Sequence, residues 1–211
     1  DVVSALASEQ AARGHRVLVV MPRYRDLKIP KGWKVHDWGA TRVPWGMGQE
    51  PARFHIAEEE NGHLRALLVE HAGERRFFDR PGFYDDPNTG EGWPDNAERF
   101  LFFARAAVEA LKGFGETFDI IHAHDQQAAW VPCFVRTHEA DEPAFADLAT
   151  IYTIHNLGYQ GIVDPWVLGV AGFTREFFFP QSPFEYWGRV NFMKVGIVFA
   201  DLVSTDRKSV V

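Results

Sequence analysis

The chain has 211 residues, of which 46% are hydrophobic and 24% charged, and its formal net charge is −7. This composition is typical of a globular protein with a sizeable core, and the negative charge argues against a general nucleic-acid binder, which would carry a basic patch. The single cysteine, Cys133, excludes an internal disulfide and a cysteine-based zinc site, and no apolar run approaches the roughly 20 residues needed to span a membrane.

The beginning of the chain predicts half of a βαβ unit. Residues 2–12 carry their apolar side chains on one helical face, and Gly14 follows as a helix-ending residue. Residues 17–21 then form a continuous apolar run, which is typical of a strand buried on both faces of a parallel sheet. Helix followed by buried strand indicates the α/β class.

A hairpin is predicted after a less regular stretch. Residues 24–48 are rich in Pro, Gly and Trp, and we expect irregular structure with short strands there. Two alternating segments, 53–56 and 64–69, flank the turn dipeptide Asn61-Gly62, which predicts a β-hairpin.

Three histidines surround this hairpin: His55, His63 and His71. Their spacing matches no metal-ligand motif, and the sequence places no acidic partner with them. We therefore interpret them as solvated surface residues and expect no metal site.

A long loop and a helix come next. Residues 80–94 are dense in Gly, Pro, Asp and Asn, and a loop of this length is typical of a functional segment. From Pro94 we predict a helix with Asp95 and Glu98 in its first turn, where the helix dipole favours acidic residues. The carboxylate of Asp95 could interact only with the helix dipole, or it could belong to a functional site.

Polar residues follow two of the later predicted strands. The first, 119–122, runs into His124 and Asp125, and a helix is predicted over 126–137, with Pro132 kinking it or marking its early turns. The second strand, 150–154, leads into a polar, Gly-rich loop at 155–161. Ligands bind beyond the carboxyl ends of strands in α/β sheets, so we expect a binding crevice here.

The remaining residues predict short helices at 166–170 and 175–178, a helix at 187–200 and a strand from Leu202.

Within the crevice we assign the site role to His124. We expect His122 to be structural, because neighbours in a strand point to opposite faces. Tyr159 could cover a sugar ring or belong to the core.

Several sequence blocks, in this order, resemble the bacterial glycogen synthases and plant starch synthases, which are retaining glycosyltransferases of the two-domain GT-B architecture. They are Asp1-Val2-Val3, Arg13-Gly14-His15-Arg16-Val17, Met21-Pro22-Arg23-Tyr24, Pro94-Asp95-Asn96, His122-Ala123-His124-Asp125, His155-Asn156-Leu157-Gly158-Tyr159-Gln160-Gly161 and Asn191-Phe192-Met193-Lys194.

The resemblance implies a Rossmann-like, open and mostly parallel sheet with helices on both faces and an inserted β-hairpin, as in the N-terminal domain of that architecture. It implies transfer of α-glucose from ADP-glucose to the non-reducing end of an α-1,4-glucan with retention, without a cofactor, a metal, nucleic acid or a membrane. The location would be the bacterial cytoplasm or a plastid.

The resemblance also implies roles for individual residues. His124 matches a histidine that contacts the glucosyl group, and Asp95 matches an acidic residue of the cleft; we take both as catalytic. Asp1 matches a loop aspartate near the donor sugar. The loop near the sugars would contribute Asn156, Tyr159, Gln160 and Gly161.

The sequence departs from the family pattern in three places. Gln126 stands where the family usually has Trp, so packing under the site is expected to differ. The family's first strand and Gly-rich loop are absent, so we expect a domain over 1–205, truncated at both ends, with unpaired strand edges. Residues 206–211 are expected to be a non-native tail, since they can be back-translated to a common sequencing-adapter read.

Two alternatives stay open. One is another retaining GT-B transferase that uses UDP-glucose or a different acceptor. The other is a non-catalytic glucan-binding protein with the same fold. If the chain belongs to a glycogen or starch synthase, we expect these 211 residues alone not to catalyse transfer. In that family the C-terminal domain supplies most of the contacts to the nucleotide.

Overall fold

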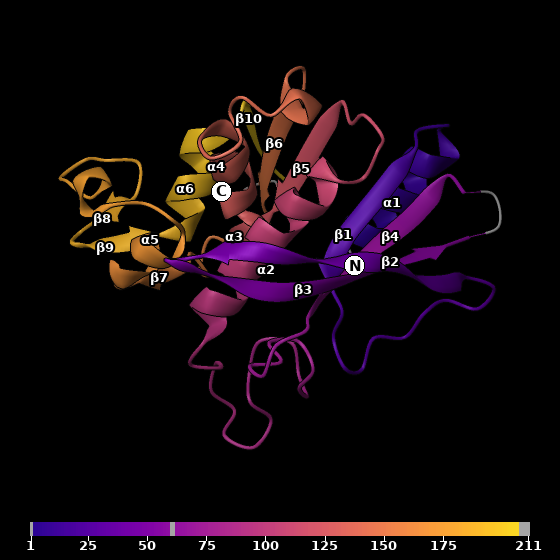
Figure 1. Cartoon of the computed structure of the whole chain (residues 1–211), viewed down its shortest axis with the longest axis horizontal. Helices are drawn as coiled ribbons and strands as arrows, with labels where there is room; N and C mark the ends of the chain where they lie inside the picture. The colour runs from indigo at the N-terminus through magenta and orange to yellow at the C-terminus, as the bar shows by residue number, and fades with distance from the viewer. Residues whose placement is uncertain (1, 60–61, 207–211) are drawn as a thin grey trace, which may run out of the picture. The chain divides into compact units, whose positions relative to one another are not determined.

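The computed structural model describes residues 2–59 and 62–206, and the chain divides into two compact units (Figure 1). Unit 1 comprises residues 1–43 and 50–96, and unit 2 comprises residues 44–49 and 97–211. Each unit is described by itself.

Unit 1 contains a mixed four-stranded sheet with the order β1-β4-β3-β2. Strand β1 (Val17–Pro22) is parallel to β4 (Leu64–His71), which is antiparallel to β3 (Gly48–Glu58), so the predicted hairpin is confirmed. The prediction of irregular structure with short strands at 24–48 is wrong for the second half of that stretch, because β2 (Lys34–Trp45) is a single 12-residue strand. Its partner β3 follows after a turn at Gly46 and Met47, and that pairing is not visible from local composition.

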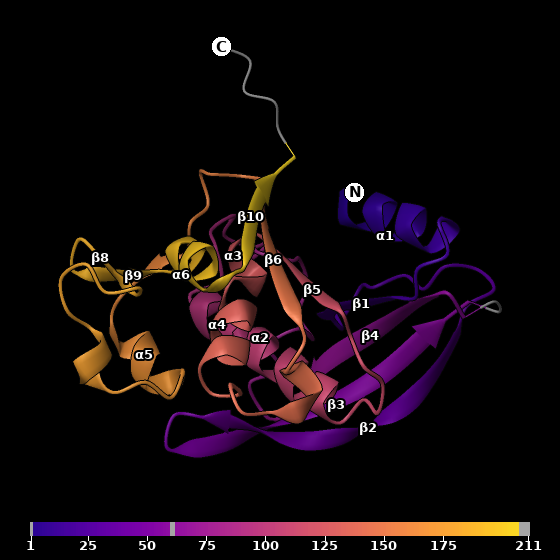
Figure 2. The ribbon, with the colours of Figure 1, turned by 90° about the horizontal axis from the view of Figure 1, so that it is seen from above.

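Helix α1 (Val2–Ala12) packs against β1 and β4, as Figure 2 shows. The helix ends at Gly14, whose φ is +92° and whose N–H donates to Ala11. The N–H of His15 reaches back to the carbonyl of Gln10, which completes a glycine-based C-cap. The predicted burial of β1 on both faces is wrong: Val17–Met21 are all partly exposed, because β1 has only β4 as a strand neighbour in the described residues.

Unit 2 is built on a parallel sheet with the order β10-β6-β5. Its strands are β5 (Ile120–His124), β6 (Ala149–Ile154) and β10 (Leu202–Thr205). Strand β5 is an edge strand of this sheet among the described residues. The parallel strands of the chain are thus divided between two sheets.

The core of unit 2 is centred on helix α2 (Asn96–Lys112), which is buried over most of its length. The helix begins two residues later than predicted, because Pro94 and Asp95 form a turn in which Asn96 N–H donates to Trp93. Trp130 lies nearby in the core, with the rings of Phe134, Phe173, Phe184 and Phe192 around it at centroid distances of 5.4–6.2 Å.

The predicted helix at 126–137 is divided into α3 (Asp125–Ala128) and α4 (Trp130–Arg136). Pro132 lies in the first turn of α4, which confirms the second of its two predicted roles. Then come the 3-10 turn η1 (Pro143–Phe145), β7 (Ile162–Val163), α5 (Trp166–Val170) and the 3-10 turn η2 (Arg175–Phe177). Both short helices lie where the sequence predicted them.

The predicted helix at 187–200 is wrong in its first part. Residues 185–191 form β8 (Glu185–Tyr186) and β9 (Arg189–Asn191), and α6 (Phe192–Phe199) begins only after them. Trp187 and Gly188 both have positive φ, as a two-residue hairpin turn requires, and Asn191 caps α6 by accepting from Lys194 N–H. Together β7, β9 and β8 make a small antiparallel sheet.

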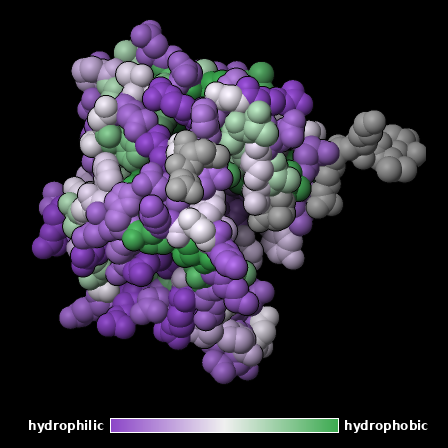
Figure 3. Space-filling view, turned by 90° about the vertical axis from the view of Figure 1, so that its right-hand side faces the viewer, coloured by the Kyte–Doolittle hydropathy of each residue, from purple (hydrophilic) through white to green (hydrophobic). Residues whose placement is uncertain are grey.

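The face drawn in Figure 3 is mostly hydrophilic, with hydrophobic residues in small patches between hydrophilic ones. Among the described residues no helix is both long and apolar enough to cross a membrane.

Candidate functional site

Two parallel strands of unit 2 bring a pair of histidines together. His124 is the last residue of β5 and lies opposite Thr153 of β6, and His155 follows the end of β6. Nδ1 of His124 is 3.0 Å from Nε2 of His155, and the rings stack with centroids 5.2 Å apart. The predicted crevice position at the carboxyl ends of the strands is therefore occupied by two contacting imidazoles.

His122 lies on the same face as His124. Their ring centroids are 4.1 Å apart, so the argument that separated them was wrong: residues two apart in a strand share a face. Nε2 of His122 is 2.6 Å from Oγ1 of Thr153, and that hydroxyl is 2.6 Å from Oγ of Ser204. His122 thus starts a hydrogen-bonded row that crosses all three strands.

Burial makes these imidazoles poor bases. Burial first, and then the neighbouring His122 and His155, together lower the pKa of His124 to about 4 against the opposing effect of Asp206. Burial, with His155, also lowers the pKa of His122. Both rings are therefore neutral at pH 7.

The partners of His155 indicate how protons are arranged in the neutral state. Nδ1 of His155 is 2.8 Å from Oδ2 of Asp206, which can only accept when ionised. With His155 neutral, its Nε2 accepts from Nδ1–H of His124. Nε2 of His124 is then an acceptor, suited to a sugar hydroxyl.

Asp125 fixes the backbone that carries this pair. Its φ is +52°, which is uncommon for a residue with a side chain. Its Oδ1 accepts the backbone N–H of His155 at 2.8 Å and of Asn156 at 3.2 Å. Neither Asp125 nor His155 was predicted as a site residue, although both lie in sequence blocks that resemble the family.

The loop at 155–161 has an exposed part. Oδ1 of Asn156 accepts from Gly158 N–H at 3.0 Å, which closes a tight turn. Tyr159 is 68% exposed and is therefore not a core residue. These two side chains are the accessible ones of the four predicted in this loop.

The other two predicted loop residues hold the loop in place. Oε1 of Gln160 accepts from the amide of Asn191 at 2.7 Å, and its Nε2 donates to the carbonyl of Leu157. Gly161 has φ +67°, and a Cβ there would lie 2.4 Å from Oε1 of Gln126 and 2.9 Å from Cβ of Phe192. Gln126, which stands where the family usually has Trp, thus occupies the space beside Gly161.

Asp95 lies in unit 1 and is held by an arginine that the sequence analysis missed. Arg80 donates to both carboxylate oxygens of Asp95, at 2.9 and 2.7 Å, and its guanidinium carbon is 4.7 Å from the centroid of the Trp93 ring. Side-chain exposures of 14% for Arg80 and 26% for Asp95 make this a partly buried, two-pronged ion pair. It fixes the direction of the carboxylate.

Asp1 and residues 207–211 lie outside the described residues. Of the expected non-native tail, only Asp206 is described, and it contacts His155. No group of three or more His, Cys, Asp or Glu side chains among the described residues could hold a metal ion.

The site chemistry in unit 2 suits a neutral, hydroxyl-rich ligand. Neutral imidazoles and an Asn amide offer hydrogen-bonding groups without net charge, and an exposed Tyr ring can cover an apolar sugar face.

Comparisons with known proteins identify the family of this chain. A family model described as the starch synthase catalytic domain matches residues 1–209. The chain is 36% identical over 208 residues to a glycogen synthase of Moorella thermoacetica, covering 99% of this chain and 40% of that protein. It is 43% identical over 129 residues to a glycogen synthase of Pseudothermotoga lettingae, covering 61% of this chain and 26% of that protein.

A solved structure confirms the predicted fold class. The catalytic domain of Starch Synthase IV from Arabidopsis thaliana, bound to ADP and acarbose, superimposes with a TM-score of 0.83 at 27% identity. The match covers 96% of this chain and 40% of that one, and the chain likewise spans about 40% of the length of the glycogen synthase from Moorella thermoacetica. On this match and the family model, the chain belongs to the starch synthase catalytic domain family.

Proposed function

We propose that this chain forms part of an ADP-glucose-dependent glycogen or starch synthase. The complete enzyme transfers α-D-glucose from ADP-glucose to the non-reducing end of an α-1,4-glucan with retention. The observation that carries the proposal is the contact between His155 and the neutral His124 at the ends of two parallel strands, in a chain of the starch synthase family. The related structure that holds ADP and acarbose supports a nucleotide and a glucan-like sugar as ligands.

We assign different roles to the site residues according to their chemistry. Nε2 of His124 accepts a hydrogen bond from a hydroxyl of the transferred glucose, while Asn156 and Tyr159 contact the sugars directly. Gln160 and Gly161 shape the loop that presents them. Asp1 lies near the donor sugar in this proposal.

A glucosyl transition state carries developing positive charge, which a fixed carboxylate stabilises. The ion pair with Arg80 supplies a fixed orientation for Asp95. Asp95 is thereby suited to an electrostatic role, because both of its carboxylate oxygens are held in one direction by Arg80.

The test measures glucosyl incorporation into glycogen by the complete protein that contains this chain. We expect incorporation from ADP-glucose and a loss of about 10²-fold or more in His124→Ala. His36→Ala, which removes an exposed histidine of unit 1, is the matched control and should keep the wild-type rate. The 211-residue chain alone should show no incorporation.

Three results would contradict the proposal in different ways. Preference for UDP-glucose over ADP-glucose in a donor competition would favour the other retaining transferase. Maltooligosaccharide binding without incorporation by the complete protein would favour a non-catalytic glucan-binding protein. Incorporation by the 211 residues alone would show that the remaining length is dispensable.

A further inference from the structure

Unit 1 contains a cavity that none of the residues above explains. It has a volume of about 580 Å³ and lies among the segments that follow β1 and β4. Pro22, the last residue of β1, pairs with Val69 of β4, so the cavity lies beyond the carboxyl end of β1 and beside the last residues of β4. Its size falls within the range of roughly 300–1,000 Å³ that is usual for small-molecule sites.

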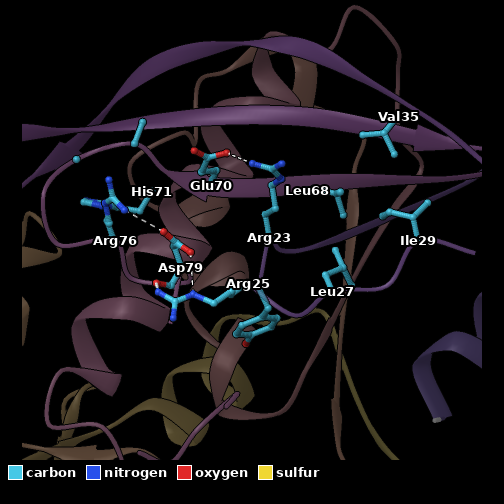
Figure 4. A pocket seen from close by; sticks show the side chains of 13 residues that line it. Arg23, Arg25, Leu27, Ile29, Val35, Leu68, Glu70, His71, Arg76 and Asp79 are labelled. Atoms are coloured by element: carbon cyan, nitrogen blue, oxygen red, sulfur yellow. Dashed lines mark hydrogen bonds and ion pairs between the residues drawn. The ribbon is translucent and has the colours of Figure 1, made fainter. Parts of the chain in front are cut away.

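One wall of the cavity is made of arginine–carboxylate pairs (Figure 4). Nη1 of Arg23 lies 2.5 Å from Oε2 of Glu70, which also contacts His55. Nε of Arg25 is 3.0 Å from Oδ1 of Asp79, and the other carboxylate oxygen of Asp79 is 3.2 Å from Arg76. The hydrogen bond from Arg25 holds the pKa of Asp79 below its ordinary value, so the pair stays ionised.

The other wall is aliphatic and, in Figure 4, lies across the cavity from Arg76 and Asp79. Leu68 is buried in it, while Ile29 is 37% and Val35 45% exposed. The two exposed side chains have no polar group to offer. They leave apolar surface opposite a charged wall. A ligand that covers both walls therefore needs polar groups on one side and apolar surface on the other.

The charges decide which ligand fits. Both lining carboxylates are already paired with arginine, so the cavity offers no free acidic cluster for a cation. An added anion would compete with Glu70 and Asp79 for the same guanidinium groups. In the contacts described, each arginine still has N–H groups beyond those used in its ion pair, and carboxylate lone pairs also remain.

A neutral ring with hydroxyls on its rim and C–H groups on its faces satisfies both walls, and that is the structure of a pyranose. We propose that this cavity is a further sugar-binding site, which holds a short segment of α-1,4-glucan with its hydroxyls on Arg23, Arg25 and Asp79 and its apolar face on Ile29 and Val35. The choice of glucan among pyranosides rests on the proposed function; the affinity for a neutral sugar does not.

The test is a titration of the complete, isotope-labelled protein that contains this chain with maltotriose, followed by the NMR shifts of the backbone amides of this chain. We expect saturable shifts at residues 23–29 and 68–73. Arg25→Ala should weaken the binding measured at these amides about tenfold, which corresponds to about 1.4 kcal/mol, because it removes a charged hydrogen-bond donor from the cavity wall.

The matched control is Arg53→Ala, which removes the guanidinium of another surface ion pair in unit 1. Arg53 and Asp37 are 51% and 49% exposed, against 49% and 47% for Arg25 and Asp79, and neither Arg53 nor Asp37 lines the cavity. Its affinity for maltotriose should equal that of the wild type. Ile29→Trp is a second variant, which fills the cavity without touching an ion pair and should also abolish the shifts.

Several outcomes would overturn the inference. Shifts confined to residues 155–161 and lost in Tyr159→Ala would place the only sugar site in unit 2. Shifts at 23–29 produced by inorganic phosphate at lower concentration than maltotriose would show an anion site. An unchanged affinity in Arg25→Ala or in Ile29→Trp would also contradict it.

The two proposals fail separately. Absence of maltotriose shifts at the cavity, with glucosyl transfer by the complete protein intact, contradicts only this inference. Maltotriose binding at the cavity, with no transfer from ADP-glucose, contradicts only the proposed function.

Discussion

Nδ1 of His124 lies 3.0 Å from Nε2 of His155, and the two rings are stacked with an angle of 22° between their planes. The contact joins residues 31 positions apart, which reach it only because β5 and β6 are parallel neighbours in fixed register. Since only one proton can lie between the two nitrogens, the contact excludes a state in which both rings are charged.

The first prediction concerns pH. Because the pKa of His124 falls from 6.5 to about 4 on folding, the unfolded chain binds a proton between these values that the folded chain does not. Stability is therefore lost as pH falls from 6.5 towards 4. One such group contributes at most about 1.4 kcal/mol per pH unit.

His124→Phe should consequently show a smaller fall in the free energy of unfolding between pH 7 and pH 5 than the wild type, measured by denaturant titration. His36→Phe serves as the control with an exposed histidine. Equal slopes in wild type and His124→Phe would show that His124 is not held neutral by the fold.

The second prediction concerns Arg80. Arg80→Lys keeps the positive charge but cannot donate to both oxygens of Asp95 or lie flat on Trp93. We expect a loss of about 1–2 kcal/mol in the free energy of unfolding and a reduced transfer rate in the complete protein. Arg76→Lys, at an exposed ion pair, should change the stability by less than about 0.5 kcal/mol. Equal effects in the two variants would argue against a special role for the Arg80–Asp95 geometry.

The third prediction separates backbone strain from crowding. Gly161→Ala places a Cβ both in a left-handed conformation and against Gln126 and Phe192. Gly14→Ala has the same backbone problem, with φ +92°, but no atom within 4 Å of the new Cβ. Strain alone costs about 1–2 kcal/mol, and overpacking adds about 1–3 kcal/mol, so Gly161→Ala should be the more destabilising in thermal or denaturant unfolding. A larger loss in Gly14→Ala would contradict the crowding argument.

The fourth prediction concerns Asp125. Asp125→Gly relieves the positive φ but leaves the N–H groups of His155 and Asn156 without their carboxylate acceptor. We expect a net loss of about 1–2 kcal/mol, since hydrogen bonds to a charged group outweigh the strain that is relieved. Faster hydrogen exchange at the amides of 155 and 156 is the specific measurement. Exchange that stays as slow as in the wild type would show that other contacts hold this loop.

Local sequence patterns were sufficient for much of the fold. The apolar run of β1, the strands β5 and β6 and the helix α1 all lie where periodicity and end signals placed them. The failures arose where a distant partner decides the conformation. Strand β2 forms because β3 pairs with it, and residues 185–191 form a hairpin because its two strands join β7 in a sheet.

The partners of several polar side chains were not predicted, because these partners also come from distant parts of the chain. His55 and His71 were interpreted as solvated, but His55 lies 3.0 Å from Glu70 and His71 is buried with Glu50 at 3.1 Å; only His63 is exposed. These carboxylates come from paired strands, so sequence spacing could not show them. The role of Arg80 was not predicted either. Arg80 is 15 residues from Asp95, and the two side chains come together only through the fold of the 80–94 loop.

The carboxylate of Asp125 also explains why a substitution next to it can be tolerated. It fastens the start of the 155–161 loop to the end of β5 through backbone N–H groups, which every residue except proline possesses. The side chain of residue 126 takes no part in that attachment; it fills space beside Gly161. A smaller amide in place of an indole at 126 therefore alters the volume beneath the loop and leaves the anchor of the strand-end histidines unchanged.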